Sequence, residues 1–312
     1  MDKKTISITI PVYNNQGSLD ETHRIISTLF LEDDFLKDYN YEIVFVNDGS
    51  KDNSLNKLLD IRAKDNNVKV VELSRNFGQG EAIIAGHHNS TGDAVITVSA
   101  DLQDPLELIK DMVQSWSRGN EIVVGYRETR EDSFFRSLTS RMYIWLINKS
   151  MREKMPPGGF DFWLLDRKAQ DAMNLIEDKI RGLHYDIYSL GFNIGLIPYH
   201  RKKRFEGKSQ YNFLKRVRFA LHGYLSISFA PIRFMTFLGM GVAFLGFIYA
   251  ITIVIAWYFN NTPFNGWAPI MVLLLIIGGI LMVMLGIIGE YLWRVYTEVQ
   301  KRPNHIVKKI HK

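Results

Sequence analysis

Carboxylate and amide side chains gather in the segment VITVSADLQDPLELI, residues 95–109. Asp101, Gln103 and Asp104 follow a run of β-branched residues typical of a buried strand, and Pro105 stands where a helix would begin. Their oxygens suit a hard cation, so we predict that Asp101 and Gln103 bind Mg²⁺ or Mn²⁺. Such an ion would offset the negative charge that develops as a diphosphate leaves. Asp104 could equally be the N-cap of the following helix.

Three further polar clusters, at residues 11–15, 47–50 and 74–78, each follow a short apolar run. Ligands of parallel sheets bind beyond the carboxyl ends of the strands, so we expect all four clusters on one rim. Asn47 and Asp48 could pair with a base edge or with ribose hydroxyls, although N-D-G-S is also ordinary turn chemistry. The chain lacks G-x-G-x-x-G after the first apolar run and G-x-x-x-x-G-K-[ST] throughout, which argues against dinucleotide and P-loop binding.

The elements that would position these loops alternate along the first 200 residues. The predicted strands are residues 5–10, 42–46, 68–73, 94–98 and 121–124. The predicted helices are residues 18–31, 54–64, 79–89 and 105–118. This alternation predicts an α/β domain whose mostly parallel sheet is covered by helices on both faces.

The last third of the chain contains two long apolar segments. Segments 235–259 and 268–292 contain one charged residue, Glu290, and each is long enough as a helix to cross a hydrocarbon core of roughly 30 Å. Residues 201–218 hold eight basic residues and one acidic one, and residues 293–312 hold six and one. These basic flanks predict two spans with both termini in the cytosol, and contact with anionic lipids rather than nucleic acid. A buried helical hairpin in a soluble protein is the alternative.

We therefore divide the chain into four parts. Residues 1–210 form a cytosolic α/β domain, 211–232 an amphipathic juxtamembrane helix, 233–293 a two-helix transmembrane hairpin and 294–312 a basic cytosolic tail. The juxtamembrane helix would lie in the interface, or alternatively pack on the α/β domain. The chain has no cysteine, which excludes disulfides and thiolate metal sites and suits a reducing cytosol. The N-terminus shows no signal-peptide layout.

The motifs together resemble the family 2 inverting glycosyltransferases with a GT-A fold, a Rossmann-like, mostly parallel α/β fold. The most similar branch is the polyprenyl-phosphate hexosyltransferases, which includes bactoprenol glucosyltransferases and dolichol-phosphate mannose synthases. The resemblance covers nearly the whole chain. It rests on the two apolar segments and on IPVYNN, FVNDGSKDNS, LSRNFGQGEAIIAG, TGDAVITVSADLQDPLELI, GGFDFWLLDRKA and RFEGKSQY.

The resemblance implies a donor site and a metal site. Residues assigned to the donor nucleotide are Pro11, Tyr13, Asn14, Asn47, Asp48, Arg75, Asn76, Ser99 and Ala100. Asp101 matches the metal-binding Asp of the D-x-D motif, with Gln103 beside it. Where the family usually reads D-A-D-L-Q-D, this chain has Ser99 in the first position, which brings no charge. The family's N-E-E after the first strand is also altered here, to N-N-Q.

The resemblance also implies an acceptor site that holds a phosphate, made by Arg127, Arg136 and Ser140. Arg136 and Ser140 are four residues apart in an expected helix, residues 133–149, so they share a face, and arginine suits bidentate phosphate contact. Asp161 would position the sugar or acceptor, or serve the structure. A closing loop would bring further contacts to the diphosphate or lipid phosphate from Arg204, Lys208 and Ser209.

A family member of this kind would transfer a hexose with inversion from a nucleotide-sugar to polyprenyl phosphate at the cytosolic face of a bacterial inner membrane. We expect UDP-glucose and undecaprenyl phosphate, with N-acetylglucosamine or mannose as alternative sugars, in modification of a cell-envelope glycan. A homotetramer and a separate flippase are also implied. Ser99 leaves a non-catalytic, membrane-tethered sugar-nucleotide-binding protein as an alternative. A processive polysaccharide synthase would need a Q-x-x-R-W motif and more spans.

Overall fold

The computed structural model describes residues 3–127, 148, 154–156, 160–176, 182–200, 230–259 and 268–312. The chain divides into two compact units. The first comprises Met1–Ala220 and Pro303–Lys312, and the second comprises Leu221–Arg302. The chain therefore leaves the first unit after residue 220 and returns to it at residue 303.

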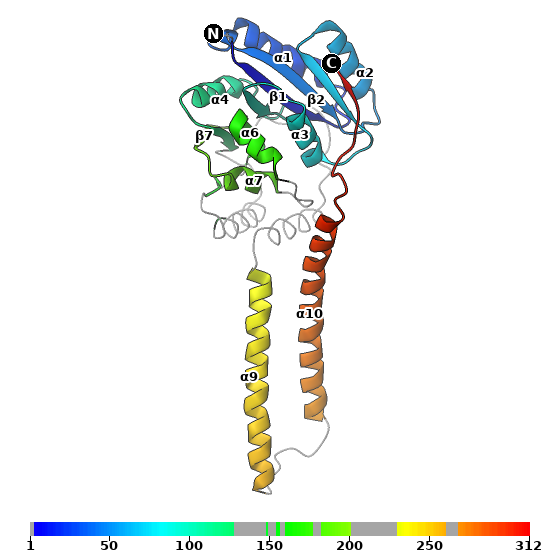
Figure 1. Ribbon diagram of the computed structural model, residues 1–312, viewed down its shortest axis with the longest axis vertical. Coiled ribbons are helices and arrows are strands. Elements are labelled where there is room, and N and C mark those ends of the chain that lie inside the picture. Colours follow the sequence, from blue (N-terminus) through cyan, green and yellow to red (C-terminus); the bar gives the residue numbers. More distant parts are fainter. Residues whose placement is uncertain are drawn as a thin grey trace. The chain divides into compact units, whose positions relative to one another are not determined.

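The first unit is built around a sheet with the strand order β7-β5-β6-β4-β1-β2-β3-β8 (Figure 1). The strands are β1 (Thr5–Val12), β2 (Asn40–Asn47), β3 (Val68–Leu73), β4 (Ala94–Thr97), β5 (Ile122–Arg127), β6 (Phe162–Asp166), β7 (Ile194–Tyr199) and β8 (Val307–His311). Among these described strands, only β6 and β8 run against their neighbours. The expected mostly parallel α/β sheet is confirmed.

Helices cover both faces of this sheet. They are α1 (Leu19–Glu32), the 3₁₀ turn η1 (Leu36–Asp38), α2 (Ser54–Lys64), α3 (Gln79–His88), α4 (Leu108–Ser117), α6 (Arg167–Asn174) and α7 (Leu183–Ser189). In β2, Ile43 and Phe45 join the larger core with α1, α2 and α4, whereas Val44 and Val46 pack with α3 on the opposite face. Burial on both faces explains why the parallel strands are continuous apolar runs.

Most expected elements appear close to their predicted bounds. Helix α4 begins later than expected, at Leu108, because Pro105–Glu107 form a turn in which the Leu108 N–H donates to the Pro105 carbonyl at 3.1 Å. Residues 294–312, expected to form a separate basic tail, are instead divided between a helix that continues to Val299 and the strand β8. Strand β8 pairs with β3, and its Lys308 ammonium lies 2.5 Å from the Glu72 carboxylate.

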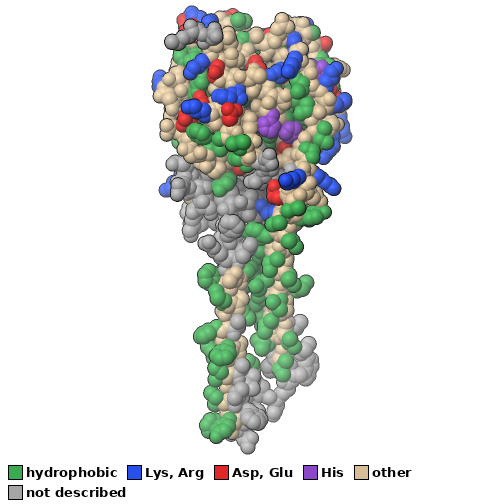
Figure 2. Space-filling view, viewed as in Figure 1, with side chains coloured by type: hydrophobic (Ala, Val, Ile, Leu, Met, Phe, Trp, Pro, Cys, Tyr) green, Lys and Arg blue, Asp and Glu red, His purple; other side chains and the backbone are tan. Residues whose placement is uncertain are grey.

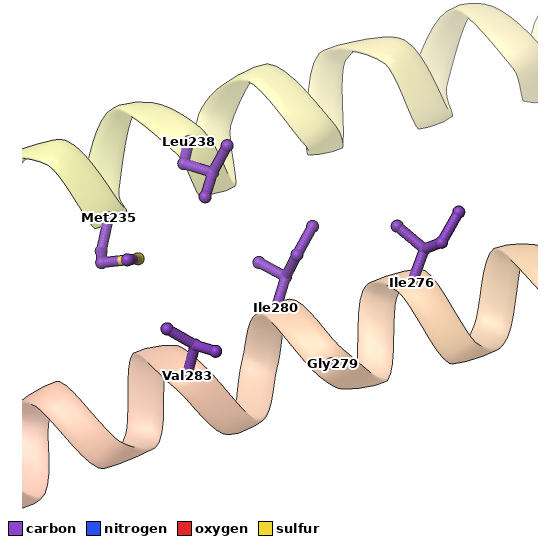
Figure 3. Close-up of a pocket in the computed structure, with 6 residues that line it drawn as sticks. All are labelled: Met235, Leu238, Ile276, Gly279, Ile280 and Val283. Carbon is purple, nitrogen blue, oxygen red and sulfur yellow. The ribbon is translucent and has the colours of Figure 1, made fainter.

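The second unit contains two long helices, α9 (Ala230–Tyr258) and α10 (Ala268–Val299). Within α10, Ile276–Val299 is long and apolar enough to cross a membrane, and none of it is buried. On the face drawn in Figure 2, hydrophobic side chains run along both helices. An apolar groove separates the helices (Figure 3), lined by Met235, Leu238, Ile276, Gly279, Ile280 and Val283. The expected interfacial helix, residues 212–229, lies outside the described residues.

Candidate active site

The candidate site lies on one edge of the sheet, where the carboxyl ends of the parallel strands meet. Strand β6 is antiparallel to β4 and β5, so its first residue points to this same edge. Asp161, directly before β6, is thereby brought to the end of β5, where Arg127 stands. The sheet thus joins segments that are widely separated in the sequence.

Side chain–backbone hydrogen bonds join the loop after β1 to the loop after β2. Asn14 has a left-handed backbone, with φ 53°, and its Oδ1 accepts the Lys51 N–H at 2.8 Å. In return, the Ser50 hydroxyl accepts the Asn14 N–H at 3.1 Å. The side chain of Asn14 therefore shapes the predicted nucleotide pocket, while Pro11 and Tyr13 are half-buried beside it.

The loop after β2 also holds the loop after β3. Asp48 is buried, with 2% exposure, and its two carboxylate oxygens accept the N–H groups of Phe77 and Gly78 at 2.7 and 2.9 Å. Burial raises the pKa of Asp48, and these hydrogen bonds oppose that shift. Gly49, with φ 62°, is required by close approach, because a Cβ there would lie 2.5 Å from the Asn76 nitrogen.

Other residues assigned to the donor lie at the end of β2 and in the loop after β3. Asn47 is buried, and its Oδ1 accepts the Ser50 N–H at 3.3 Å. Arg75 and Asn76 are exposed, and the Arg75 guanidinium lies 4.0 Å from the centre of the Phe77 ring. Hydrogen bonds between the loops after β1, β2 and β3 therefore bring together the three loops that were predicted to bind the nucleotide.

The segment after β4 carries the predicted metal ligand. The Ser99 hydroxyl donates to Asp101 Oδ1 at 2.8 Å, and the Gln103 N–H donates to the same oxygen at 3.3 Å. Leu102 has φ 54°, which turns the chain sharply between them. The buried Ala100 accepts the Ser18 hydroxyl at its carbonyl, 2.6 Å away, which ties this loop to the start of α1. Ser99 thus orients Asp101 instead of adding a charge.

Asp101 and Gln103 offer two oxygen donors, so a hard cation held here would need its remaining ligands from a bound molecule or water. Within the described ranges, no group of three or more His, Cys, Asp or Glu side chains is placed to hold a metal. Asp101 supplies a carboxylate and Gln103 an amide, both oxygen donors of the kind that Mg²⁺ and Mn²⁺ prefer.

At the end of β5, polar side chains form a series of contacts, and one of its members, Tyr199, was not predicted from the sequence. Arg127 forms an ion pair with Asp161, and its Nε lies 3.5 Å from the Tyr199 hydroxyl. The Tyr199 hydroxyl donates to Asp104 Oδ1 at 2.7 Å, and burial, followed by the charge of Asp104, raises its pKa to about 12. Asp104 therefore has a tertiary partner, and the alternative that it caps the following helix is wrong, because the N-cap of α4 is Glu107. Tyr199 had no sequence signal, because β7 was not predicted.

His184, at the start of α7, lies beside Asp161 at the same edge of the sheet. Its Nε2 lies 2.5 Å from the Phe160 carbonyl oxygen and 3.8 Å from Asp161 Oδ1. The Phe160 ring packs edge-on against the imidazole, with centroids 4.7 Å apart. Desolvation lowers the pKa of His184, so the ring is neutral near pH 7 and its Nε2–H donates to the carbonyl.

The protein-family model described as glycosyl transferase family 2 matches residues 7–172. An uncharacterized glycosyltransferase of Synechocystis is 36% identical over 97% of this chain and 94% of its own length. The chain belongs to glycosyl transferase family 2. The bactoprenol glucosyl transferase of Shigella phage SfII is 32% identical to this glycosyltransferase over 98% of both chains.

Solved structures agree with the fold of this family 2 glycosyltransferase. Glucosyl-3-phosphoglycerate synthase from Mycobacterium tuberculosis superposes with a TM-score of 0.51 at 20% identity, covering 72% of this chain and 81% of that one. The expected GT-A fold is thus confirmed. The predicted acceptor residues Arg136 and Ser140, and the predicted closing-loop residues Arg204, Lys208 and Ser209, lie outside the described residues.

Proposed function

We propose that this glycosyltransferase transfers a hexose, most simply glucose from UDP-glucose, to polyprenyl phosphate with inversion of the anomeric centre. The observation that carries the proposal is that a carboxylate suited to a metal and an arginine suited to a phosphate lie at the same edge of the sheet. Asp101 stands with the nucleotide loops, and Arg127 with Asp161 stands at the end of β5. The full-length similarity to proteins named bactoprenol glucosyl transferase, at 32% identity, supports a lipid-phosphate acceptor.

On the donor side, Asp101 and Gln103 would hold Mg²⁺ or Mn²⁺. When bound, the ion offsets the charge on the departing diphosphate. The loops joined by Asn14 and Asp48 would receive the nucleoside, with Tyr13 against it. The ordered hydrogen bonds within these loops fix their shape before the donor arrives, which reduces the entropy lost on binding.

On the acceptor side, Arg127 would bind the lipid phosphate together with Arg136 and Ser140. A phosphate oxygen attacks the anomeric carbon from the face opposite the diphosphate, the new C–O bond forms, and the bond to the diphosphate breaks. Phosphate is already an anion near pH 7, so no dedicated general base is needed. Asp161 would orient the sugar or the acceptor, and Arg204, Lys208 and Ser209 would close over the phosphates.

The membrane arrangement follows from the charge pattern. Residues 233–293 would cross a bacterial inner membrane twice, with residues 211–232 in the interface and both termini in the cytosol. The basic residues on both flanks would face anionic lipid head groups. The product would then cross through a separate flippase. A homotetramer is proposed from family resemblance.

The test uses purified full-length protein with undecaprenyl phosphate, Mn²⁺ and radiolabelled UDP-glucose, UDP-N-acetylglucosamine or GDP-mannose. We expect label from UDP-glucose in the organic phase, and its loss after addition of EDTA. Asp101→Asn should lower the rate by roughly a hundredfold or more, since it removes the charge that holds the ion. Full activity in Asp101→Asn would overturn the metal assignment. Nucleotide binding without transfer from any donor would favour the non-catalytic alternative.

A further inference from the structure

The rim contains a buried tyrosine that the proposed reaction does not use. Tyr199 is the last residue of β7 and lies directly opposite Arg127, the last residue of β5, in the parallel register of these two strands. Tyr199 is 3% exposed, so little of its surface is available to a ligand. Any effect of Tyr199 on the reaction must pass through the groups that its hydroxyl contacts.

Those groups belong to the two sides of the site. The hydroxyl donates to Asp104, three residues after Asp101, at 2.7 Å. The same oxygen lies 3.5 Å from Arg127 Nε, at the outer limit of hydrogen bonding. The stronger bond fixes the position of the hydroxyl, and the weaker contact favours one orientation of the guanidinium.

Arg127 is held from its other end by Asp161. The guanidinium is 10% exposed and the carboxylate 40% exposed, so the pair lies at the border between protein and solvent. A planar guanidinium binds phosphate through two parallel N–H groups, which makes its orientation decisive for affinity. The contacts at Nε and at the terminal nitrogen together determine which edge of Arg127 can turn toward a ligand.

We propose that Tyr199 is a positioning residue, which orients Arg127 for the acceptor phosphate and links that side of the rim to the Asp101–Asp104 loop. This inference rests on the proposed function only in taking Arg127 as a phosphate ligand. It requires no step in which Tyr199 gives up its proton or touches the substrate.

The test measures binding of farnesyl phosphate to the full chain in detergent, by calorimetry, separately from sugar transfer. Tyr199→Phe removes only the hydroxyl and should raise the Kd for farnesyl phosphate about three- to tenfold, the usual effect of one lost hydrogen bond. The Kd for UDP with Mn²⁺ should stay unchanged. A general destabilisation of the fold would instead weaken the binding of both ligands. Tyr41→Phe is the matched control, because its ring stacks on Phe30 with centroids 5.0 Å apart, in another part of the sheet.

A double-mutant cycle decides whether Tyr199 acts through Arg127. Adding Tyr199→Phe to Arg127→Ala should change the Kd for farnesyl phosphate no further. Additive effects, an unchanged Kd in Tyr199→Phe, or no lipid-phosphate binding by the unmodified protein would each overturn the inference. If farnesyl phosphate binds and the two substitutions are non-additive as expected, but no sugar is transferred, the proposed function alone is refuted. If Tyr199→Phe does not fold, Asp104→Ala removes the same hydrogen bond from its other end and must give the same cycle.

Discussion

At the scale of single residues, the chemistry of the rim depends on how each polar side chain is held. Ser99 stands where the family usually has an acid, and its hydroxyl donates to Asp101 at 2.8 Å. An aspartate there would add charge, whereas serine contributes orientation. The structure thus gives Ser99 a role at the proposed metal ligand that is compatible with catalysis.

We predict that Ser99→Ala raises the Mn²⁺ concentration needed for half-maximal activity by about fivefold, because Asp101 loses a hydrogen bond that fixes its carboxylate. Ser99→Asp should lower that concentration by adding a second carboxylate. A Mn²⁺ titration of the transfer rate measures both. Ser117→Ala, which removes an exposed hydroxyl that donates to the Gln114 carbonyl within α4, should match the unmodified protein. An unchanged titration in Ser99→Ala would show that this hydroxyl does not position Asp101.

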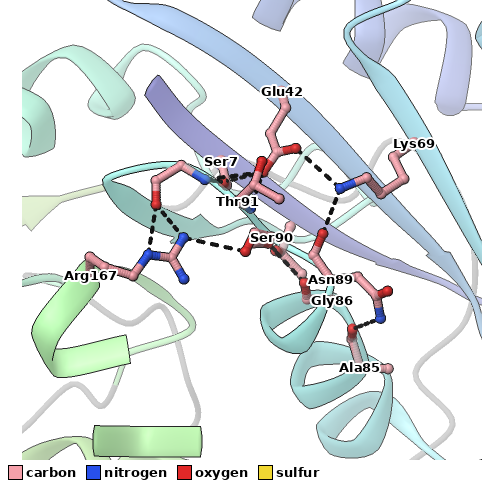
Figure 4. A network of polar contacts seen from close by, with 11 residues as sticks. Ser7, Glu42, Lys69, Ala85, Gly86, Asn89, Ser90, Thr91 and Arg167 are labelled. Carbon is pink, nitrogen blue, oxygen red and sulfur yellow. Dashed lines mark hydrogen bonds and ion pairs between the residues drawn. The ribbon is translucent and has the colours of Figure 1, made fainter. Parts of the chain in front are cut away.

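Glu42, near the start of β2, anchors a second polar network (Figure 4). Its Oε1 accepts the Ser7 hydroxyl at 2.6 Å and the Thr91 N–H at 2.5 Å, and its Oε2 lies 3.3 Å from the Lys69 ammonium. Burial opposes ionisation of Glu42, but these donors outweigh it and lower its pKa below the usual 4.5. Ionised Glu42 therefore stabilises the fold above that pH.

This stabilisation should disappear as the pH falls from about 4.5 through the lower folded-state pKa, since protonation then removes the charge that the network binds. We predict that Glu42→Gln lowers the free energy of unfolding at pH 7 by about 1–3 kcal/mol and flattens its acid dependence. Thermal melts in detergent between pH 3 and pH 7 measure both effects. The exposed Glu32→Gln is the control, and parallel pH curves for Glu42→Gln and the unmodified protein would contradict the assignment.

At the scale of elements, the site depends on how closely helices approach the sheet. Helix α3 packs on β1 and β2 through Gly86, where an added Cβ would lie 2.1 Å from Thr9 Cγ2 and 3.0 Å from Val46 Cγ2. Both neighbours belong to buried β-strands, so they have little room to move. Gly86 thereby sets the distance between the strands and α3, which follows the loop after β3 that is predicted to bind the nucleotide.

We predict that Gly86→Ala lowers the free energy of unfolding by about 1–3 kcal/mol, because the helix must shift away from the sheet. Gly80→Ala in the same helix is the matched control, since its Cβ would meet only Leu183 Cδ1 at 3.8 Å. Denaturant or thermal unfolding of the two variants measures the difference. Equal stability of Gly86→Ala and Gly80→Ala would show that α3 does not pack as closely as described.

At the scale of the whole molecule, one chain combines a GT-A unit with two long apolar helices. Because residues 303–312 belong to the first unit, both ends of the helical segment are covalently connected to the catalytic unit. Two spans with cytosolic termini satisfy this connectivity, since an even number of crossings returns the chain to the side from which it left. The proposed topology and the pairing of β8 are thus mutually consistent.

The absence of cysteine from the chain allows a clean test of that topology. We predict that Thr262→Cys reacts with a membrane-impermeant maleimide added to intact cells, whereas Lys312→Cys reacts only after the membrane is opened. The cysteine-free protein is the control for background labelling. Protection of residue 262 in intact cells, together with its labelling after lysis, would contradict a hairpin that crosses twice.

The sequence by itself determined the alternation of elements, the four polar loops and the family. These features are local, since a buried parallel strand is apolar along its length and a rim loop is polar wherever the strand ends. The prediction that Asp101 binds a metal therefore depends only on its immediate neighbours. The apolar segments were equally readable, because their length and apolar composition can be read directly from the sequence.

Only the tertiary structure decided which distant residues meet. Asp161 reaches Arg127 because β6 enters the sheet antiparallel, and Tyr199 reaches Asp104 across 95 positions because β7 joins β5. Likewise, β8 has the charged composition of a tail, yet it pairs with β3 and its Lys308 contacts the carboxylate of Glu72. Such pairings depend on strand order and register, which follow from the burial of the whole sheet, so no local pattern in the chain reveals them.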